Sequence, residues 1–371
     1  MEIRIEPAKL SITGEYFMKT TSYTFLMISL MFVGFRWGGE TLEKIKTKAD
    51  AGDTHYQAIL GSIYRKGELG VRKDYEKAIQ YLAPAVKARN GLALAQLGAM
   101  CANGEKTAKD KSKAERLYAV AVPGLKQMAE NGDARSQYTL GCLHMEGSGG
   151  LQSNLVTAVD WFKKSAKQNY AGSQFALGMC YFQGIGAIPD KRTAFKWFEK
   201  AAKQHHSDAQ LKLGYFYENG DGVGKNEQKA FDLYMCAAEL DHPVAQFLLG
   251  LAYLRGLTGE KDDEKALLWF IKALETGLPS ELQVSAQEQI PLLQVSIGSQ
   301  YATKKNEKQA AELLYKALKS GNTNAIALVK EFLAIDGLQE VAPNLKTYLA
   351  VLEKGQPIIQ AEPADLDKKN K

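Results

Sequence analysis

The chain has 371 residues, of which 45% are hydrophobic and 24% are charged. This composition is typical of a folded protein and excludes a chain that is disordered throughout. Its 47 lysines and arginines are intermixed with 42 aspartates and glutamates, so no basic block supports nucleic-acid binding. The four cysteines lie far apart, without a CxxC pair or a histidine at ligand spacing. They indicate neither a zinc site nor a redox dithiol, and we expect them in the core.

The N-terminal region contains an uncharged run of 16 residues, 20–35, with the sequence TTSYTFLMISLMFVGF. This run is slightly shorter than the roughly 17–25 residues that usually span a bilayer, and it suits the hydrophobic core of a secretory signal. We therefore expect residues 1–40 to be a signal peptide or a short membrane anchor. The expected location is the periplasm or cell envelope, with membrane association through residues 20–35.

Two readings of this region stay open. If Met18 is the initiator, Lys19 supplies the positive charge of a signal, and residues 1–17 are an artefact of the start site. The small-x-small pattern of a cleavage site is missing after residue 35. Alternatively, the apolar run is a buried first helix of a cytoplasmic protein.

A Leu-Gly pair recurs along most of the chain with a period near 36 residues, which indicates a repeat array. The glycines of these pairs are Gly61, Gly98, Gly141, Gly178, Gly214 and Gly250. A second glycine follows each of them after six residues, at Gly67, Gly104, Gly147, Gly184, Gly220 and Gly256. The first glycine lies inside a helical pattern, where glycine costs roughly 1 kcal/mol relative to alanine. We expect a close helix–helix contact at each first glycine to offset this cost.

Each repeat also contains a second helical pattern, which starts at an alanine. These alanines are Ala78, Ala114, Ala158, Ala194, Ala230 and Ala266. Large residues follow three and four positions later, as in Trp161-Phe162, Trp197-Phe198 and Trp269-Phe270, and form one apolar stripe at the helical period. The pattern of each repeat therefore predicts three parts in order: a helix A that ends at the second glycine, then a loop, and then a helix B. One hairpin cannot bury both of its faces, so the hairpins must stack, with the Trp-Phe pairs inserted between small residues.

A seventh, degenerate unit follows at residues 294–321. The residues that keep its register are Gly298 and Tyr301 in helix A and Ala311, Leu314 and Tyr315 in helix B. We expect residues 321–355 to form a C-terminal helical cap and residues 356–371 to be a disordered, solvated tail.

The string A-Q-x-x-L-G-x-x-Y-x-x-G, a loop, and then K-A-x-x-W-F-x-x-A-A resembles the Sel-one-like repeat, a relative of the tetratricopeptide repeat. The best matches are residues 173–206, 209–242 and 245–277. The resemblance implies an all-α fold, a right-handed α/α superhelix (solenoid) of about seven stacked helical hairpins over residues 41–320. It also implies that the A helices line a concave surface.

Members of this family generally act as adaptors that bind other proteins or peptides, and bacterial members are often exported. The resemblance therefore implies a scaffold that binds a protein or peptide in its concave groove and has neither catalytic activity nor a cofactor. Repeat 2 departs from the pattern, because Cys101 replaces the usual tyrosine and the following loop lacks a second glycine pair. We expect repeat 2 to be the least regular.

The titratable residues of the repeats predict no catalytic or metal site. His206 and His242 occupy equivalent positions one repeat apart, and adjacent helices pack about 10 Å from each other. This separation is too large for joint ligation of one metal ion at roughly 2.0–2.1 Å. Asp208 and Asp262 lie at predicted helix starts, where acidic residues complement the helix dipole.

The residues one and four positions after the Leu-Gly glycine lie along a second stripe of helix A. Those predicted to line a peptide-binding groove are Met145, Met179, Phe182, Tyr215, Glu218, Leu251 and Leu254. Methionine and aromatic side chains adapt to a bound helix or extended peptide. Packing in the core is the alternative role for each of them. Three positions before the glycine, Tyr138 and Phe175 are expected in the core.

Two further hypotheses compete with the scaffold. An envelope-associated enzyme or small-molecule binder, acting on cell-wall material, needs polar groups that converge in the groove, and the sequence offers Glu218, His144 and Glu146. A cytoplasmic assembly scaffold is the other, with its apolar N-terminus packed on the first repeat.

Overall fold

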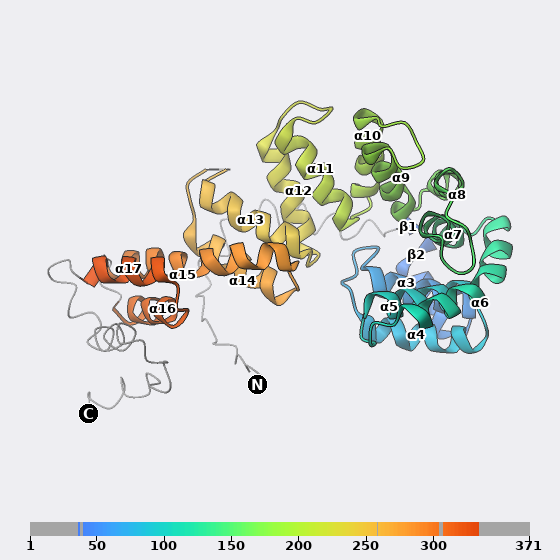
Figure 1. Cartoon of the computed structure of the whole chain (residues 1–371), viewed down its shortest axis with the longest axis horizontal. Coiled ribbons are helices and arrows are strands. Elements are labelled where there is room, and N and C mark those ends of the chain that lie inside the picture. Colours follow the sequence, from blue (N-terminus) through green and yellow to red (C-terminus); the bar gives the residue numbers. More distant parts are fainter. Residues whose placement is uncertain (1–35, 38–39, 258, 304–306, 334–371) are drawn as a thin grey trace.

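The computed structural model describes residues 36–37, 40–257, 259–303 and 307–333. These residues form a curved array of helices, together with a two-residue antiparallel pairing of β1 (Arg36–Trp37) and β2 (Glu40–Thr41) (Figure 1). The helices are α2 (Leu42–Asp50), α3 (Thr54–Lys66), α4 (Tyr75–Lys87), α5 (Gly91–Asn103), α6 (Lys111–Glu130), α7 (Ala134–Glu146), α8 (Leu155–Lys167), α9 (Ala171–Gln183), α10 (Lys191–Ala202), α11 (Ser207–Asn219), α12 (Glu227–Glu239), α13 (Pro243–Arg255), α14 (Asp263–Glu275), α15 (Ser280–Thr303), α16 (Glu307–Lys319) and α17 (Thr323–Leu333).

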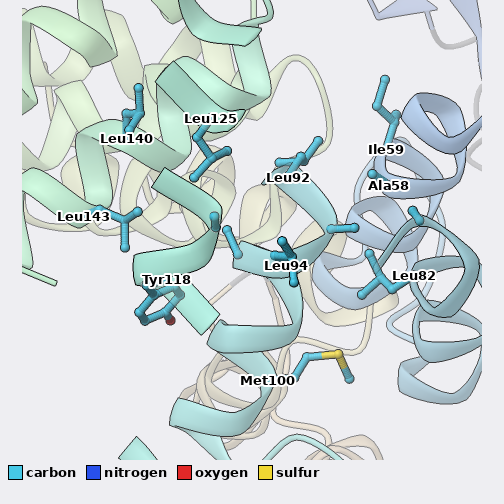
Figure 2. Packing of buried hydrophobic residues seen from close by; sticks show 14 of the residues in the cluster. Ala58, Ile59, Leu82, Leu92, Leu94, Met100, Tyr118, Leu125, Leu140 and Leu143 are labelled. Atoms are coloured by element: carbon cyan, nitrogen blue, oxygen red, sulfur yellow. The ribbon is translucent and has the colours of Figure 1, made fainter. Parts of the chain in front are cut away.

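Seven helical hairpins, from α3/α4 to α15/α16, make up the array. The two helices of each hairpin pack on each other, and helix B of each hairpin packs on helix A of the next. Ahead of the first hairpin, α2 buries Ile45 and Ala49 against it. In the first three repeats one apolar cluster runs from Ile59 in α3 to Leu140 in α7 (Figure 2). The predicted all-α fold, a right-handed solenoid of about seven repeats, is confirmed.

The glycine of each Leu-Gly pair is the contact point within its own hairpin. A Cβ built on Gly178 would lie 2.5 Å from Cε1 of Phe198, and one built on Gly250 would lie 2.6 Å from Cε1 of Phe270. Every first glycine from repeat 1 to repeat 6 faces such a large residue of helix B. The helix contact expected at these glycines is therefore present, and it offsets the cost of glycine in a helix.

The two residues of a Trp-Phe pair pack on different clusters, and the phenylalanine is the one that lies on the glycine of its own hairpin. Phe198 is fully buried on Gly178, whereas Trp197 is half-buried and packs on the cluster formed between α8 and α9. Lys200 Nζ covers the outer face of this indole, 4.3 Å from the ring. Consecutive helical positions point about 100° apart, so one residue faces its own hairpin and the other its neighbour.

The helix ends follow a repeated capping pattern. The second glycine of each repeat adopts the left-handed conformation that ends helix A, with φ between +64° and +77°. Each helix B from α4 to α14 begins at an aspartate or asparagine whose side chain accepts a backbone N–H of the first turn. Asp262 is one of these N-caps, and Asp208 lies in the first turn of α11, as predicted.

A buried glutamine links consecutive repeats. Gln137 of α7 donates from Nε2 to the carbonyl of Ala129 at 2.9 Å, and it accepts from Gln168 at 2.8 Å. Gln246 of α13 donates in the same way to the carbonyl of Ala238. These bonds explain the glutamine of the repeated A-Q motif, because a buried amide has to be paired on both sides.

Repeat 2 is irregular in its helix B rather than in its loop. The α6 helix has 20 residues, whereas the B helices of repeats 3 to 6 have 12 or 13, so the extra sequence extends the helix. Lys106, with φ +53°, adopts the left-handed conformation that Gly186 and Gly222 supply in other loops. In the seventh unit, Leu314 packs on Gly298 and Ala310 is fully buried. The register of this helix B therefore begins at Ala310, and the expected start at Ala311 is wrong.

The predictions for the two ends of the chain are not addressed by the described residues. Residues 1–35 and 334–371 lie outside them, so the signal or anchor and the tail stay predictions. The α17 helix occupies the start of the segment expected to form the C-terminal cap. Among the described helices, none combines the length and the hydrophobicity of a membrane span.

Candidate functional site

The loop between α3 and α4, residues 67–74, contacts the starts of helices from later repeats. Glu68 reaches Arg135 in α7 and Tyr170 before α9. Arg72 lies 3.1 Å from the carboxylate of Asp241, just before α13. The array therefore curves until its first loop meets repeats 3 to 6 (Figure 1). We call the surface made by this loop and the starts of α7, α9 and α11 the inner surface.

Arg135 is the buried centre of these contacts. Its side chain is 2% exposed, and Nη1 lies 2.5 Å from Oε2 of Glu68. The same nitrogen donates to Oγ of Ser62 at 3.1 Å. Tyr170 donates its hydroxyl proton to Oε1 of Glu68 at 2.7 Å. Burial acts to raise the pKa of Glu68, but the charges of Arg135 and Lys66 outweigh burial and hold this pKa below its ordinary value.

Lys66 lies beside this network at the end of α3. Its Nζ donates to Oη of Tyr170 at 3.1 Å and lies 4.2 Å from the ring centre of Tyr138. The nearest carboxylate oxygen is Oε1 of Glu68, at 3.8 Å. Burial lowers the pKa of Lys66 to about 8, although Glu68 opposes the shift. Since Arg135 lies closer to Glu68, Lys66 shares a counter-ion and has none of its own.

A cavity of about 250 Å³ opens on the inner surface beside Lys66. It lies between the first loop and the starts of α9 and α11. Its charged and titratable lining includes Arg65, Lys66, Lys73, Glu105, His206 and Asp208. Its aromatic lining is Tyr75, Tyr138, Tyr170 and Phe175. The cavity therefore combines ammonium groups, carboxylates and aromatic rings.

His206 and His242 are N-caps of their A helices, which agrees with their predicted place in the turn. Nδ1 of His206 accepts the N–H of Ala209 at 3.4 Å, and Nδ1 of His242 accepts that of Ala245 at 3.3 Å. The ring of His206 also stacks on Phe175, with 4.9 Å between centroids. Burial lowers the pKa of His206, which favours the neutral form that a capping acceptor needs. Within the described ranges, no group of three or more potential ligands is arranged to hold a metal ion.

All seven residues predicted to line the groove are half-buried, and none of them lines this cavity. Phe182 contacts Phe216 of the next repeat, with 5.5 Å between ring centroids. Glu218 accepts a hydrogen bond from the hydroxyl of Tyr234 at 2.6 Å. Leu251 and Leu254 pack against the cluster between α13 and α15. Partial exposure is the property that the groove hypothesis required, but peptide binding by these residues stays a prediction.

Tyr138 and Phe175 pack against buried apolar clusters, as expected, and they also line the cavity. Their equivalents Leu211 and Phe247 are buried, as expected. The first loop approaches α7 and α9, so this helix position borders both the core and the cavity in repeats 3 and 4, whereas it is buried in repeats 5 and 6.

The residues nominated for an enzyme do not form a site. Glu218 is bonded to Tyr234 within its own hairpin. Burial and then Glu115 raise the pKa of Glu146, while burial lowers the pKa of His144. None of the three lines the cavity, and Glu218 belongs to α11 whereas His144 and Glu146 belong to α7.

Sequence reasoning missed Lys66, Arg135 and Tyr170, although one signal was present. Tyr170 stands where other A helices have a capping aspartate, asparagine or histidine, and it provides no side-chain cap. A residue that breaks a repeated capping rule indicates another role for its side chain. Here its hydroxyl joins Glu68 and Lys66 across the inner surface.

Comparison with known proteins identifies the repeats. The Sel1 repeat family matches residues 54–90, 91–121, 134–170, 171–206, 207–242, 243–277 and 297–322. A search of curated proteins finds no significant relative.

Several solved structures are similar to this chain. A Sel1 repeat protein from Oxalobacter formigenes is 27% identical, over 64% of this chain and 88% of that chain, with a TM-score of 0.43. A protective antigen of uropathogenic Escherichia coli with an SLR fold is 24% identical, over 87% of this chain and 77% of that chain, with a TM-score of 0.43. An immunity protein from Pseudomonas aeruginosa is 19% identical, over 62% and 82%, with a TM-score of 0.41. Because the seven matched segments cover more than half of this chain, it belongs to the Sel1 repeat family, whose members generally mediate protein–protein interactions.

Proposed function

We propose that this chain is a non-catalytic scaffold that binds a protein or peptide along its inner surface. The observation that carries this proposal is the stripe on α9 formed by Phe175, Met179 and Phe182. These residues are spaced by four and three positions and so share one face of the helix. Phe175 lines the cavity, and all three side chains are half-buried. The stripe thus continues from the cavity along α9 and offers a partner both a pocket and an apolar path.

The polar groups of the inner surface favour a binding role over a catalytic one. Lys66, Tyr170 and Glu68 hydrogen-bond or pair with one another, and Arg65 contacts both carboxylate oxygens of Glu105 at 3.2 and 3.1 Å. The bond from Tyr170 to Glu68 stabilises the curvature of the array, while Lys66, which shares its counter-ion with Arg135, can recognise a charged partner.

Site-specific photo-crosslinking tests this proposal. A benzophenone amino acid is placed at Lys73 or Phe175, which line the cavity on the inner surface, and at Val156 or Leu268 as controls in B helices. The two control positions are 63% and 62% exposed. We expect one partner to be crosslinked from the inner positions and not from the controls. Equal capture from both sets, or no specific capture from the inner positions, would contradict the proposal.

We also propose that the chain is exported to the cell envelope. The support is the uncharged run of residues 20–35 with Lys19 before it. Cell fractionation with N-terminal sequencing of the native protein tests this. A processed N-terminus near residues 36–43 in the periplasm, or retention of residues 20–35 in a membrane fraction, is the expected result. A soluble cytoplasmic protein that begins at Met1 would refute export.

A further inference from the structure

We propose that the cavity beside Lys66 binds a single carboxylate group of the partner, with Lys66 at its floor and Lys73 at its mouth. This inference rests on the proposed function, because it names the chemical group through which the inner surface holds its partner. The site is built by the first loop, α7, α9 and α11.

The charges around the cavity leave ammonium groups without carboxylates of their own. Each lining carboxylate already has a closer cation or hydrogen-bond donor. Glu68 pairs with Arg135 at 2.5 Å, Glu105 with Arg65 at 3.1 Å, and Asp208 with His242 at 3.1 Å. Lys66 lies 3.8 Å from Glu68, which it shares with Arg135. Lys73 also lines the cavity; its charge lowers the pKa of Asp208, but no carboxylate oxygen of the described residues lies within ion-pair distance of its ammonium group. Arg65, Lys66, Lys73 and the buried Arg135 together outnumber the carboxylates of Glu68, Glu105 and Asp208 by one charge, and an anion is the ligand that would balance it.

Lys66 is built to receive such a ligand. An ammonium group has three N–H donors, and one of them is directed to Oη of Tyr170 at 3.1 Å. The side chain is only 20% exposed, and a mostly buried cation is costly unless it is paired. The pKa of about 8 shows that the protein's own groups compensate this charge incompletely. A carboxylate oxygen beside Nζ would supply the missing charge and hydrogen bonds.

The other walls of the cavity select the size and charge of the ligand. Glu68, Glu105 and Asp208 would repel a dianionic phosphate more strongly than a monoanionic carboxylate. The rings of Phe175 and Tyr75 provide an apolar wall. The volume of about 250 Å³ lies below the roughly 300–1,000 Å³ of pockets for drug-sized ligands. One amino-acid residue that carries a carboxylate fits these three properties.

The carboxylate can come from a peptide C-terminus or from an acidic side chain, and three matched probes distinguish these sources. Acetyl-Ala-Phe-Leu has a free C-terminal carboxylate, its C-terminal amide has none, and acetyl-Ala-Phe-Glu-amide has only a side-chain carboxylate. Isothermal titration of the full chain at pH 7 measures each affinity. We expect one or both carboxylate peptides to bind at least about tenfold more tightly than the uncharged amide. Equal affinities for all three, or no saturable binding of any, would overturn the carboxylate site.

The variant Lys66→Met tests the residue assigned to the floor. It keeps the length of the side chain and removes its charge, and we expect at least a tenfold loss of affinity for the carboxylate peptide that binds. The matched control is Lys111→Met, an exposed lysine at the start of α6, which should bind as the wild type does. Because Lys66 is a poorly compensated cation, we expect Lys66→Met to melt at a higher temperature than the wild type, so lost binding would not reflect unfolding. Unchanged affinity in Lys66→Met would refute the assignment.

The pH profile provides a second, independent readout. The charged and titratable groups that face Lys66 are Glu68 from the loop, Arg65 from α3, Arg135, Tyr138 and Cys142 from α7, Tyr170 before α9, and His206 before α11. Burial raises the pKa of Cys142 and that of Tyr170. Protonated Lys66 is therefore the form that binds, and affinity should fall above about pH 8. A constant affinity up to pH 10 would contradict the site.

The titration and the crosslinking experiment separate this site from the scaffold proposal. If neither carboxylate peptide binds more tightly than the amide while crosslinks from the inner positions persist, the scaffold proposal stands and the carboxylate site does not.

Discussion

At Gly178 the missing Cβ leaves room for the ring of Phe198, and this one contact explains why glycine recurs inside every helix A. In an open helix, alanine would be about 1 kcal/mol better than glycine. In α9, however, the added Cβ would lie 2.5 Å from Cε1 of Phe198, which is closer than carbon atoms pack in proteins. Overpacking therefore outweighs helix propensity at this position.

We expect Gly178→Ala to lower the free energy of unfolding by about 1–2 kcal/mol, measured by urea denaturation. Gly224→Ala is the control, because a Cβ there would meet nothing within 4 Å, and its effect should stay within about 0.5 kcal/mol. In the Phe198→Ala background the added methyl group should cost much less, since the ring is gone. A Gly178→Ala protein as stable as the wild type would show that the contact does not determine the glycine.

At the scale of the elements, the helix starts are alike in geometry and different in chemistry. The B helices begin at aspartate or asparagine, while α11 and α13 begin at histidines that accept through Nδ1. A protonated imidazole cannot accept at Nδ1. These two helix starts therefore depend on the neutral form of histidine.

The capping role of His206 predicts a pH dependence of stability. Burial lowers the pKa of His206 in the folded chain, so the unfolded chain binds the proton first as the pH falls. The contribution of neutral His206 to the free energy of unfolding is complete above the pKa of about 6.5 that the residue has in the unfolded chain. Below that pH the contribution is lost, by up to about 1.4 kcal/mol per pH unit. Urea denaturation at pH 7.5, 6.5 and 5.5 measures this loss.

His206→Asn is the matched variant, because asparagine also caps helices and does not titrate. We expect the free energy of unfolding of this variant to decrease less between pH 7.5 and pH 5.5 than that of the wild type. Part of the slope should remain, since burial also lowers the pKa of His144 and that of His205. The same acid sensitivity in both proteins would rule out His206 as its source.

The sequence predicted the helix pairs, their caps and the glycine contacts because each depends on residues within about one repeat. Periodicity reports which residue faces a neighbouring helix, and that is a local property. It could not separate the two interfaces of Trp197 and Phe198, since both are large and apolar. It also could not show why Tyr170 lacks a capping side chain, because the partners of Tyr170 belong to another repeat.

At the scale of the whole molecule, the candidate site depends on the curvature of the array. Lys66 and Tyr170 are 104 positions apart in sequence, yet 3.1 Å separates Nζ from Oη. Small rotations at each of the intervening interfaces sum to this closure. No local pattern in the sequence encodes that sum, so the cavity could not be predicted even though all of its helices were.

Arg135 and Arg72 each form an ion pair between the first loop and a later repeat, and Arg135 is buried whereas Arg72 is exposed. The variants of these two arginines should therefore differ in stability. Arg135→Met leaves Glu68 mostly buried with the hydroxyl of Tyr170 as a donor and Lys66 as the one cation in ion-pair distance among the described residues. We expect a cost of about 3 kcal/mol, at the lower end for a broken buried pair. Arg72 is 70% exposed beside Asp241, and Arg72→Met should cost less than about 1 kcal/mol. Urea denaturation of both variants checks this order. Equal effects would mean that burial of Arg135 does not determine its contribution.

The inner surface exists only if the first loop meets the later repeats in solution, and a distance between these parts measures this directly. Spin labels on unnatural amino acids at residues 76 and 239 report the distance between the start of α4 and the end of α12 by pulsed electron resonance, and they leave the four native cysteines unlabelled. We expect one short, narrow distance distribution in the wild type and a broader, longer one in Arg135→Met. A broad distribution of long distances in the wild type would contradict the closed inner surface and, with it, both binding proposals.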